Sequence, residues 1–214
     1  MMAFLNANIA FILALFLYGF IHFLNRWIHR HNGWIFIVAL ILSAMIFFID
    51  IPLISPVIDS GHVTLAFFLL VMTAGILPKK SIFYKKILLV RGDLAILGFI
   101  FLVPHGIVRL SLALYGYNPT GLFASIIMIP LVISSFMVIR KRIRPDRWKK
   151  LHRFAYLAYL MIYIHLGFDI SINPNNFYLL VSPLSLIFHL YFILYLALKV
   201  WMMIKKKKGL MPSE

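Results

Sequence analysis

The sequence predicts an all-α integral membrane protein, a bundle of about seven transmembrane helices with the N-terminus outside and the C-terminus inside. Two observations lead to this fold class. The chain is 63% hydrophobic and only 13% charged, whereas soluble domains carry about 25% charged residues. The connections between the apolar segments also alternate between basic and nearly uncharged. No soluble domain of useful size is left over.

Seven segments meet the length of about 20 apolar residues that a membrane-spanning helix needs. They are 3–24, 34–55, 62–78, 87–114, 121–139, 151–170 and 177–199. The first could be mistaken for a signal peptide, but it lacks a charged start and a small-residue cleavage site. Its positive charges, Arg26 and Arg30, come after it. We therefore expect a retained helix whose N-terminus is outside.

The loops agree with a single orientation. The basic loops are 25–33, 79–86, 140–150 and the tail at 205–208, which we place inside because positive charge marks cytoplasmic loops. Residues 56–61 carry only Asp59, and 115–120 and 171–176 carry no charge, so we place these loops outside. Short connections predict that sequential helices are antiparallel neighbours.

The formal net charge is +15, from 21 Lys and Arg against 6 Asp and Glu. In this apolar chain the cations are topology signals that contact membrane lipid, and they do not predict a nucleic-acid partner. Cysteine is absent, which excludes disulfides, iron–sulfur clusters and thiol catalysis. The 8 histidines are therefore the expected metal ligands.

Two histidines fall at the same predicted depth. His105 lies in the outer part of the fourth segment, and His165 lies roughly 20 Å outward from His152 at about 1.5 Å per residue. Facing imidazoles on neighbouring helices are what a b-type haem needs, because its iron accepts two axial nitrogens. Gly106 leaves room for a flat ring, and Arg109, one turn outward, would reach the propionates. The alternative for a lone membrane histidine is a hydrogen-bonded interior residue.

His152 sits at the inner boundary and is rotated about 140° from His165 on a straight helix. An inner haem would need another ligand there, and His22 is a candidate. We expect one haem, with two as the alternative. The remaining histidines are less informative: His29 and His31 in a basic loop, His62 at the start of the third segment, and His189 in the seventh, which stays unassigned.

The run Arg147-Trp148-x-x-Leu151-His152-x-x-x-Tyr156, followed by His165, resembles the ferric-reductase-like transmembrane domain. The similarity is closest to the haem-binding membrane subunit of the bacterial periplasmic methionine-sulfoxide reductase system, and it covers about residues 55–200. It implies haem iron bound by histidines at the positions of His105, His152 and His165. It also implies a multi-pass protein of the bacterial inner membrane that passes electrons from cytoplasmic flavin or quinol to acceptors outside.

The resemblance gives three parts to the chain. Residues 1–33 are an extra N-terminal helix and basic loop, which that subunit does not have. Residues 34–204 form the haem-binding helical bundle, and 205–214 are a basic cytoplasmic tail. We assign no catalytic residue, because the pattern indicates an electron-transfer subunit with redox partner proteins rather than a self-contained enzyme.

The same residues bear on other function classes. A haem-free transporter or channel is the alternative, and it would have paired intramembrane charges or broken helices, of which this chain offers few. A retinal receptor needs a lysine in the middle of its last helix, but Lys199 lies at the inner end. There is no Gly-rich dinucleotide loop, so the donor must be a quinol, a bound flavin such as FMN, or a partner. The basic surface could dock a flavin phosphate, an acidic donor protein or anionic lipid.

Overall fold

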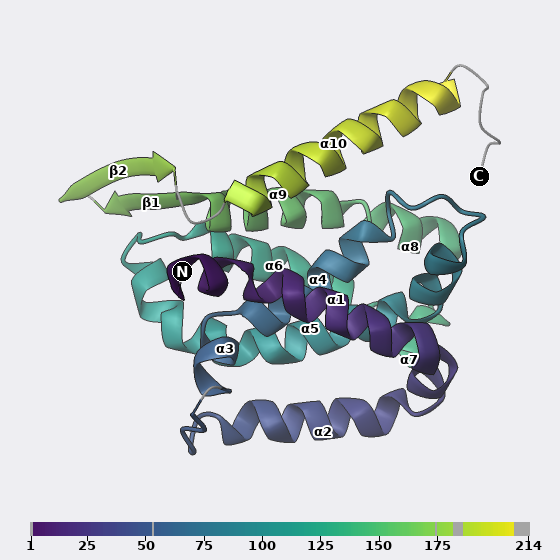
Figure 1. The fold of residues 1–214 in the computed structure, drawn as a ribbon, viewed down its shortest axis with the longest axis horizontal. Helices are drawn as coiled ribbons and strands as arrows, with labels where there is room; N and C mark the ends of the chain where they lie inside the picture. Colours follow the sequence, from purple (N-terminus) through teal and green to yellow (C-terminus); the bar gives the residue numbers. More distant parts are fainter. Residues whose placement is uncertain (1, 53, 174, 182–185, 208–214) are drawn as a thin grey trace.

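The computed structural model describes residues 2–52, 54–173, 175–181 and 186–207 as helices packed side by side, with one β-hairpin (Figure 1). The helices are α1 (Met2–Arg30), α2 (Asn32–Met45), α3 (Ser55–Asp59), α4 (His62–Thr73), α5 (Ile82–Leu114), α6 (Thr120–Ile133), α7 (Met137–Arg140), α8 (Pro145–Leu151), α9 (Phe154–Gly167) and α10 (Leu186–Lys207). The strands are β1 (Phe168–Asn173) and β2 (Asn176–Val181). The start of α1 and the hairpin lie at one end of the bundle, and α7, α8 and the end of α10 lie at the other.

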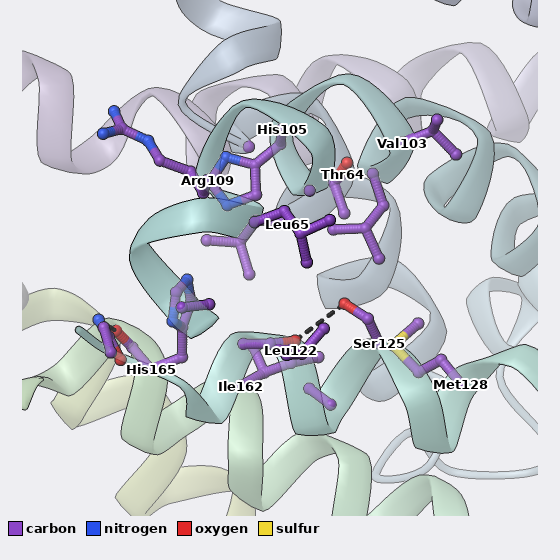
Figure 2. Close-up of a pocket in the computed structure, with 18 of the residues that line it drawn as sticks. Thr64, Leu65, Val103, His105, Arg109, Leu122, Ser125, Met128, Ile162 and His165 are labelled. Carbon is purple, nitrogen blue, oxygen red and sulfur yellow. Dashed lines mark hydrogen bonds between the residues drawn. The ribbon is translucent and has the colours of Figure 1, made fainter. Parts of the chain in front are cut away.

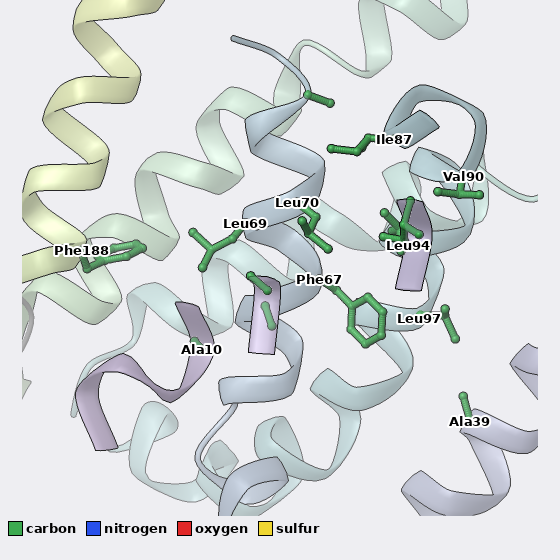
Figure 3. Close-up of a cluster of buried hydrophobic side chains, with 14 residues drawn as sticks. Ala10, Ala39, Phe67, Leu69, Leu70, Ile87, Val90, Leu94, Leu97 and Phe188 are labelled. Carbon is green, nitrogen blue, oxygen red and sulfur yellow. The ribbon is translucent and has the colours of Figure 1, made fainter. Parts of the chain in front are cut away.

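The core is built around α4, which packs against both α1 and α5. Most of its side chains are buried, including Phe67, Phe68 and Leu70. Figure 3 shows Phe67 and Leu70 of α4 beside Leu94 and Leu97 of α5. Large apolar side chains such as Phe23 (84% exposed) and Phe48 (87% exposed) cover the outside. A buried apolar centre with an equally apolar exterior is what a lipid environment requires.

Each of the seven predicted apolar segments contains a helix, but the helices differ in length. Three are long and apolar enough to cross a membrane: Asn8–Arg30, Ile82–Leu114 and Leu186–Lys205. The shorter apolar helices are Asn32–Met45, His62–Thr73 and Thr120–Ile133. A helix of 14 residues is about 21 Å long, less than the hydrocarbon core of about 30 Å. The structure is therefore that of a helical membrane protein, while seven spans and their orientation stay predictions.

The structure is consistent with the predicted all-α class, but the last two predicted segments differ from the helices, because a short hairpin joins α9 to α10. The segment 151–170 was expected to be one helix, but α9 begins at Phe154 and ends at Gly167. β1 then pairs with β2, whereas the sequence predicts residues 177–181 in the last helix. The sequence Phe168-Asp-Ile-Ser-Ile-Asn173 alternates apolar and polar residues, which is the period of a strand. Mean hydropathy does not show this alternation, because it is averaged over neighbouring residues and because isoleucine and phenylalanine are hydrophobic in helices and strands alike.

The strand β1 also binds the connection between α5 and α6. Asn118 N–H donates to the carbonyl of Ile170 at 2.7 Å, and Ile172 N–H donates to the carbonyl of Gly116 at 2.9 Å. Gly116 has φ +89°, a conformation that glycine adopts without strain. The hairpin thus fixes the α5–α6 connection next to the end of α9.

The N-terminal pair α1–α2 is fastened to α5 at the end that carries the basic loops. Asp93 of α5 is buried and contacts His29 Nδ1 at 3.0 Å, and Asn32 Nδ2 donates to its other oxygen at 2.9 Å. Lys86 Nζ donates to the carbonyl of His22 at 2.6 Å. The sequence predicts His29 in a basic loop, but α1 continues to Arg30 and brings His29 to Asp93. A buried carboxylate requires such partners.

Candidate functional site

A cavity of about 560 Å³ lies between α4, α5, α6 and α9. This volume falls within the range of about 300–1,000 Å³ that is usual for cofactor sites. Its walls are mostly apolar, and Figure 2 shows aliphatic side chains such as Leu122 and Ile162 beside a small number of polar groups. The polar or charged residues that line it are Ser60, Thr64, His105, Arg109, Tyr117, Asn118, Ser125 and His165. Two of the three predicted metal ligands and the predicted propionate partner, Arg109, are among them.

His105 enters the cavity from α5, one residue after Pro104. Its Nδ1 lies 2.7 Å from the backbone carbonyl oxygen of Asp59. A carbonyl can only accept, so Nδ1–H donates and the neutral ring keeps its lone pair on Nε2. Gly61, with φ +79°, turns the chain from α3 into α4, and a Cβ there would lie 3.3 Å from the imidazole. The turn therefore needs glycine both for its conformation and for the close approach of His105.

His165 enters from α9 and packs against the backbone at the start of α6. A Cβ on Gly121 would lie 2.7 Å from His165 Cε1 and 2.8 Å from Nδ1, so only glycine leaves space for this ring. The carbonyl of His165 accepts a hydrogen bond from Asn118 Nδ2 at 2.9 Å. Nδ1 is buried and has no hydrogen-bond partner in the described chain. A buried, unpartnered polar atom is costly, and the same holds for Nε2 of His189 among the described residues.

The two imidazoles face the same part of the cavity. Their ring centroids are 6.2 Å apart and their planes are inclined by 74°. A metal–imidazole bond is about 2 Å long, and the centroid lies about 1 Å behind the nitrogen, so two imidazoles on opposite sides of one metal ion have centroids about 6 Å apart. The observed centroid spacing matches this value, which is one condition for a single metal ion between the two rings.

The rest of the cavity also fits a b-type haem. A Cβ on Gly106 would meet no atom within 4 Å, so this side of α5 leaves room for a flat group. Arg109 lies one turn after His105 on the same helix and is exposed, where it can bind carboxylates. Thr64 was not predicted from the sequence, yet its buried Oγ1 lines the cavity and lacks a partner among the described residues. The sequence does not distinguish Thr64 from other threonines in helices, so only its position in the folded protein shows that it lines the cavity.

Comparison with known proteins identifies the family. The model of the ferric reductase like transmembrane component matches residues 57–163, which is half of the chain. The chain belongs to the ferric reductase-like transmembrane family. The family match includes His105 and His152 and ends two residues before His165. The description of the family places the matched residues in the transmembrane component of ferric reductase-like proteins.

Relatives of this ferric reductase-like protein add little further detail. It is 26% identical over 166 residues to an uncharacterized protein of Treponema pallidum (strain Nichols). The alignment covers 71% of this chain and 46% of that protein, so the chain spans about half the length of the relative. No solved structure matches.

His152, the third predicted ligand, lies outside the cavity of this ferric reductase-like chain. It follows α8 and stacks on Trp148, with ring centroids 3.9 Å apart. Its Nε2 is 3.0 Å from Ser134 Oγ, which itself donates to the carbonyl of Leu131. Burial, together with the charges of Arg91 and Arg140, lowers the pKa of His152 to about 4, so the ring is neutral at pH 7. The structure therefore brings His105 and His165 together and leaves His152 apart.

The candidate partner for an inner haem is also separate. The ring of His22 neighbours Tyr18, Phe23 and Phe83, whereas the ring of His152 neighbours Trp148 and Ser134. Within the described residues, no group of three or more histidine or carboxylate side chains is placed to hold a metal ion.

His189, left unassigned by the sequence, is partly buried beside α9. Tyr163 OH lies 3.0 Å from its Nδ1, and its Nε2 has no partner in the described part of the chain. A Cβ on Gly167 would lie 2.7 Å from His189 Cε1. The residue does not line the cavity, which makes it a useful comparison for the other two histidines.

Proposed function

We propose that this protein holds one b-type haem between His105 and His165 and carries electrons across the membrane. The electrons pass from a donor on the cytoplasmic side to an acceptor on the outer side. The single observation that carries the proposal is the imidazole pair, with centroids 6.2 Å apart, in a largely apolar cavity. Bound there, haem supplies an iron that takes up and releases one electron at a time.

The side chains of the cavity have distinct parts in this proposal. His105 presents Nε2 because its Nδ1–H is held by the Asp59 carbonyl. His165 is kept against Gly121, which limits how far its ring can turn. The aliphatic walls exclude water, which lowers the local dielectric constant and favours the low-charge state of a buried centre. Arg109 supplies positive charge for the carboxylates of the cofactor.

The direction of transfer follows from the proposed topology of seven spans in the bacterial inner membrane, with the N-terminus outside and the C-terminus inside. The basic loops around α7 and α8 then face the cytoplasm, and the donor is a flavin, a quinol or a partner reductase on that side. The hairpin end faces outward, three residues after His165. The acceptor there is a sulfoxide reductase partner or ferric iron.

We propose one haem rather than two. A second haem at His152 needs a further ligand beside it, and the Nε2 of His152 is hydrogen-bonded to Ser134. A pyridine haemochrome assay on purified protein, with protein quantified by amino-acid analysis, should give a ratio near one. A ratio near two would restore His152 as a ligand.

An absorption spectrum tests the haem itself. Protein expressed with haem available should show a Soret band and, after dithionite, an α-band. His105→Ala and His165→Ala should lose both bands, whereas His189→Ala should keep them, because His189 is a partly buried histidine that does not line the cavity. Colourless wild-type protein, or equal loss of colour in all three variants, would refute the proposal.

A further inference from the structure

A second concave site lies at the basic end of the bundle, away from the haem cavity. A groove of about 610 Å³ is lined by His29, Lys85, Leu88, Leu89, Met137 and Arg140. We call it the basic groove. Its residues come from the end of α1, the first turns of α5 and the short helix α7, and Figure 1 shows α7 and the end of α1 at the same end of the molecule. None of them has a part in the proposed electron transfer.

The basic groove combines cations with exposed apolar side chains. Lys85 lies one helical turn before Leu88 and Leu89, so these three share one face of α5. Arg140 lies one turn after Met137 on α7. Leu88 and Leu89 are each 41% exposed. Each of the two helices therefore contributes one cation and an apolar surface beside it.

Arg140 is held in place by its neighbours. Its guanidinium carbon lies 4.3 Å from the centroid of the Trp148 ring. The indole of Trp148 donates from Nε1 to the carbonyl of Ser134 at 3.2 Å, which anchors the ring. Stacking occupies the face of the guanidinium and leaves its N–H edge available, and this planar edge matches the geometry of phosphate. The guanidinium of Arg140 is thus preorganised to bind an oxyanion.

Among the residues that the structure describes, no carboxylate lines the basic groove to neutralise these cations. Asp93 is close, because His29 joins it to the groove, but both of its oxygens are taken by His29 and Asn32. The bond from Nδ1 of His29 to Asp93 also fixes the orientation of that ring. The uncompensated cations therefore favour a ligand with an anionic group. The exposed leucine and methionine side chains favour a ligand that also has an apolar group.

We infer that the basic groove binds one anionic phospholipid, with its phosphate between Lys85 and Arg140 and an acyl chain along Leu88, Leu89 and Met137. A soluble phosphate would leave the apolar surface unused, and a zwitterionic lipid would leave the positive charge uncompensated. Each basic side chain near a membrane surface contributes about 1 kcal/mol of attraction to anionic lipid, which corresponds to about fivefold in affinity. This inference does not depend on the haem.

Native mass spectrometry of delipidated protein in a neutral detergent tests the site. Phosphatidylglycerol, phosphatidylcholine with the same acyl chains, and glycerol phosphate are titrated separately. The double variant Lys85→Gln/Arg140→Gln should bind phosphatidylglycerol about thirtyfold more weakly than wild type. The control Lys141→Gln/Arg142→Gln removes the same charge from exposed residues that follow Arg140 but do not line the groove, and it should bind like wild type.

Two single variants keep the test decisive if the double variant folds poorly. Lys85 and Leu89 are both exposed, so Lys85→Gln and Leu89→Ser should fold, and Lys85→Gln should weaken phosphatidylglycerol binding about fivefold. Equal loss in the groove and control variants would mean that only general surface charge matters. Equal binding of phosphatidylcholine, or of glycerol phosphate, would overturn the assignment to an anionic lipid.

Discussion

The contact between Gly121 and His165 gives the most direct test of the site, through the substitution Gly121→Ala. The added methyl carbon would lie 2.7 Å from His165 Cε1, 2.8 Å from Nδ1 and 3.1 Å from Nε2. Ordinary carbon contacts are about 3.5–4.0 Å, so the imidazole has to retreat by about 1 Å. A movement of that size is half the length of a bond between imidazole and metal, which is about 2 Å.

The expected effects follow from this displacement. Overpacking of this kind costs about 1–3 kcal/mol, and the gain from replacing glycine by alanine in a helix, about 0.5–1 kcal/mol, offsets only part of it. Gly121→Ala should therefore lower the free energy of unfolding in detergent by about 1–2 kcal/mol. It should also lower haem content, measured as the ratio of Soret to 280 nm absorbance. Gly19→Ala is the control, because a Cβ there meets nothing within 4 Å.

A double variant separates the packing effect from a general defect. The double variant His165→Ala/Gly121→Ala lacks the ring that the new methyl group would meet. Its loss of unfolding free energy should therefore be smaller than the sum of the losses in the two single variants, while haem stays absent. If Gly121→Ala binds haem like wild type at unchanged stability, His165 does not lie against α6 and the reasoning fails. Strict additivity of the two substitutions would lead to the same conclusion.

Three further predictions concern other parts of the chain. In Gly61→Ala the alanine has to adopt the left-handed backbone of this turn, which costs about 1–2 kcal/mol, and its Cβ crowds His105. The thermal midpoint should fall and the haem reduction potential should shift. An unchanged potential would argue against the role of this turn. The pKa of His152 is about 4 in the folded protein and about 6.5 in the unfolded chain. Between these pH values the unfolded chain binds more protons than the folded protein, so the free energy of unfolding falls as the pH drops from 6.5 to 4. His152→Gln should flatten that part of the curve in melts from pH 7.5 to 4.5, and an unaltered slope would contradict the assignment. Because the chain has no cysteine, Tyr115→Cys should react with an impermeant maleimide from outside intact cells and Lys141→Cys only after lysis; the reverse pattern would invert the topology.

The sequence was enough to predict the environment and the main histidine pair. Hydropathy is a local property, so each apolar segment predicted a helix, and a constant rise per residue placed His105 and His165 at one depth. The absence of cysteine narrowed the metal ligands to histidine. The alternating pattern of 168–173 was also visible in the sequence, but the hydropathy average concealed it. The ligand roles of the histidines stay predictions, although the rings lie together.

Tertiary structure decided how these histidines are held and which residues stand apart from them. Nothing local to Asp59, Gly61 or Gly121 shows that each touches an imidazole, because these contacts join elements far apart in the chain. The separation of His152 from the cavity likewise depends on tertiary packing, because His152 follows α8 and its Nε2 lies at hydrogen-bond distance from Ser134 at the end of α6. Pairing between distant segments is set by packing and hydrogen bonding in three dimensions, whereas helix formation and membrane burial follow from neighbouring residues along the chain.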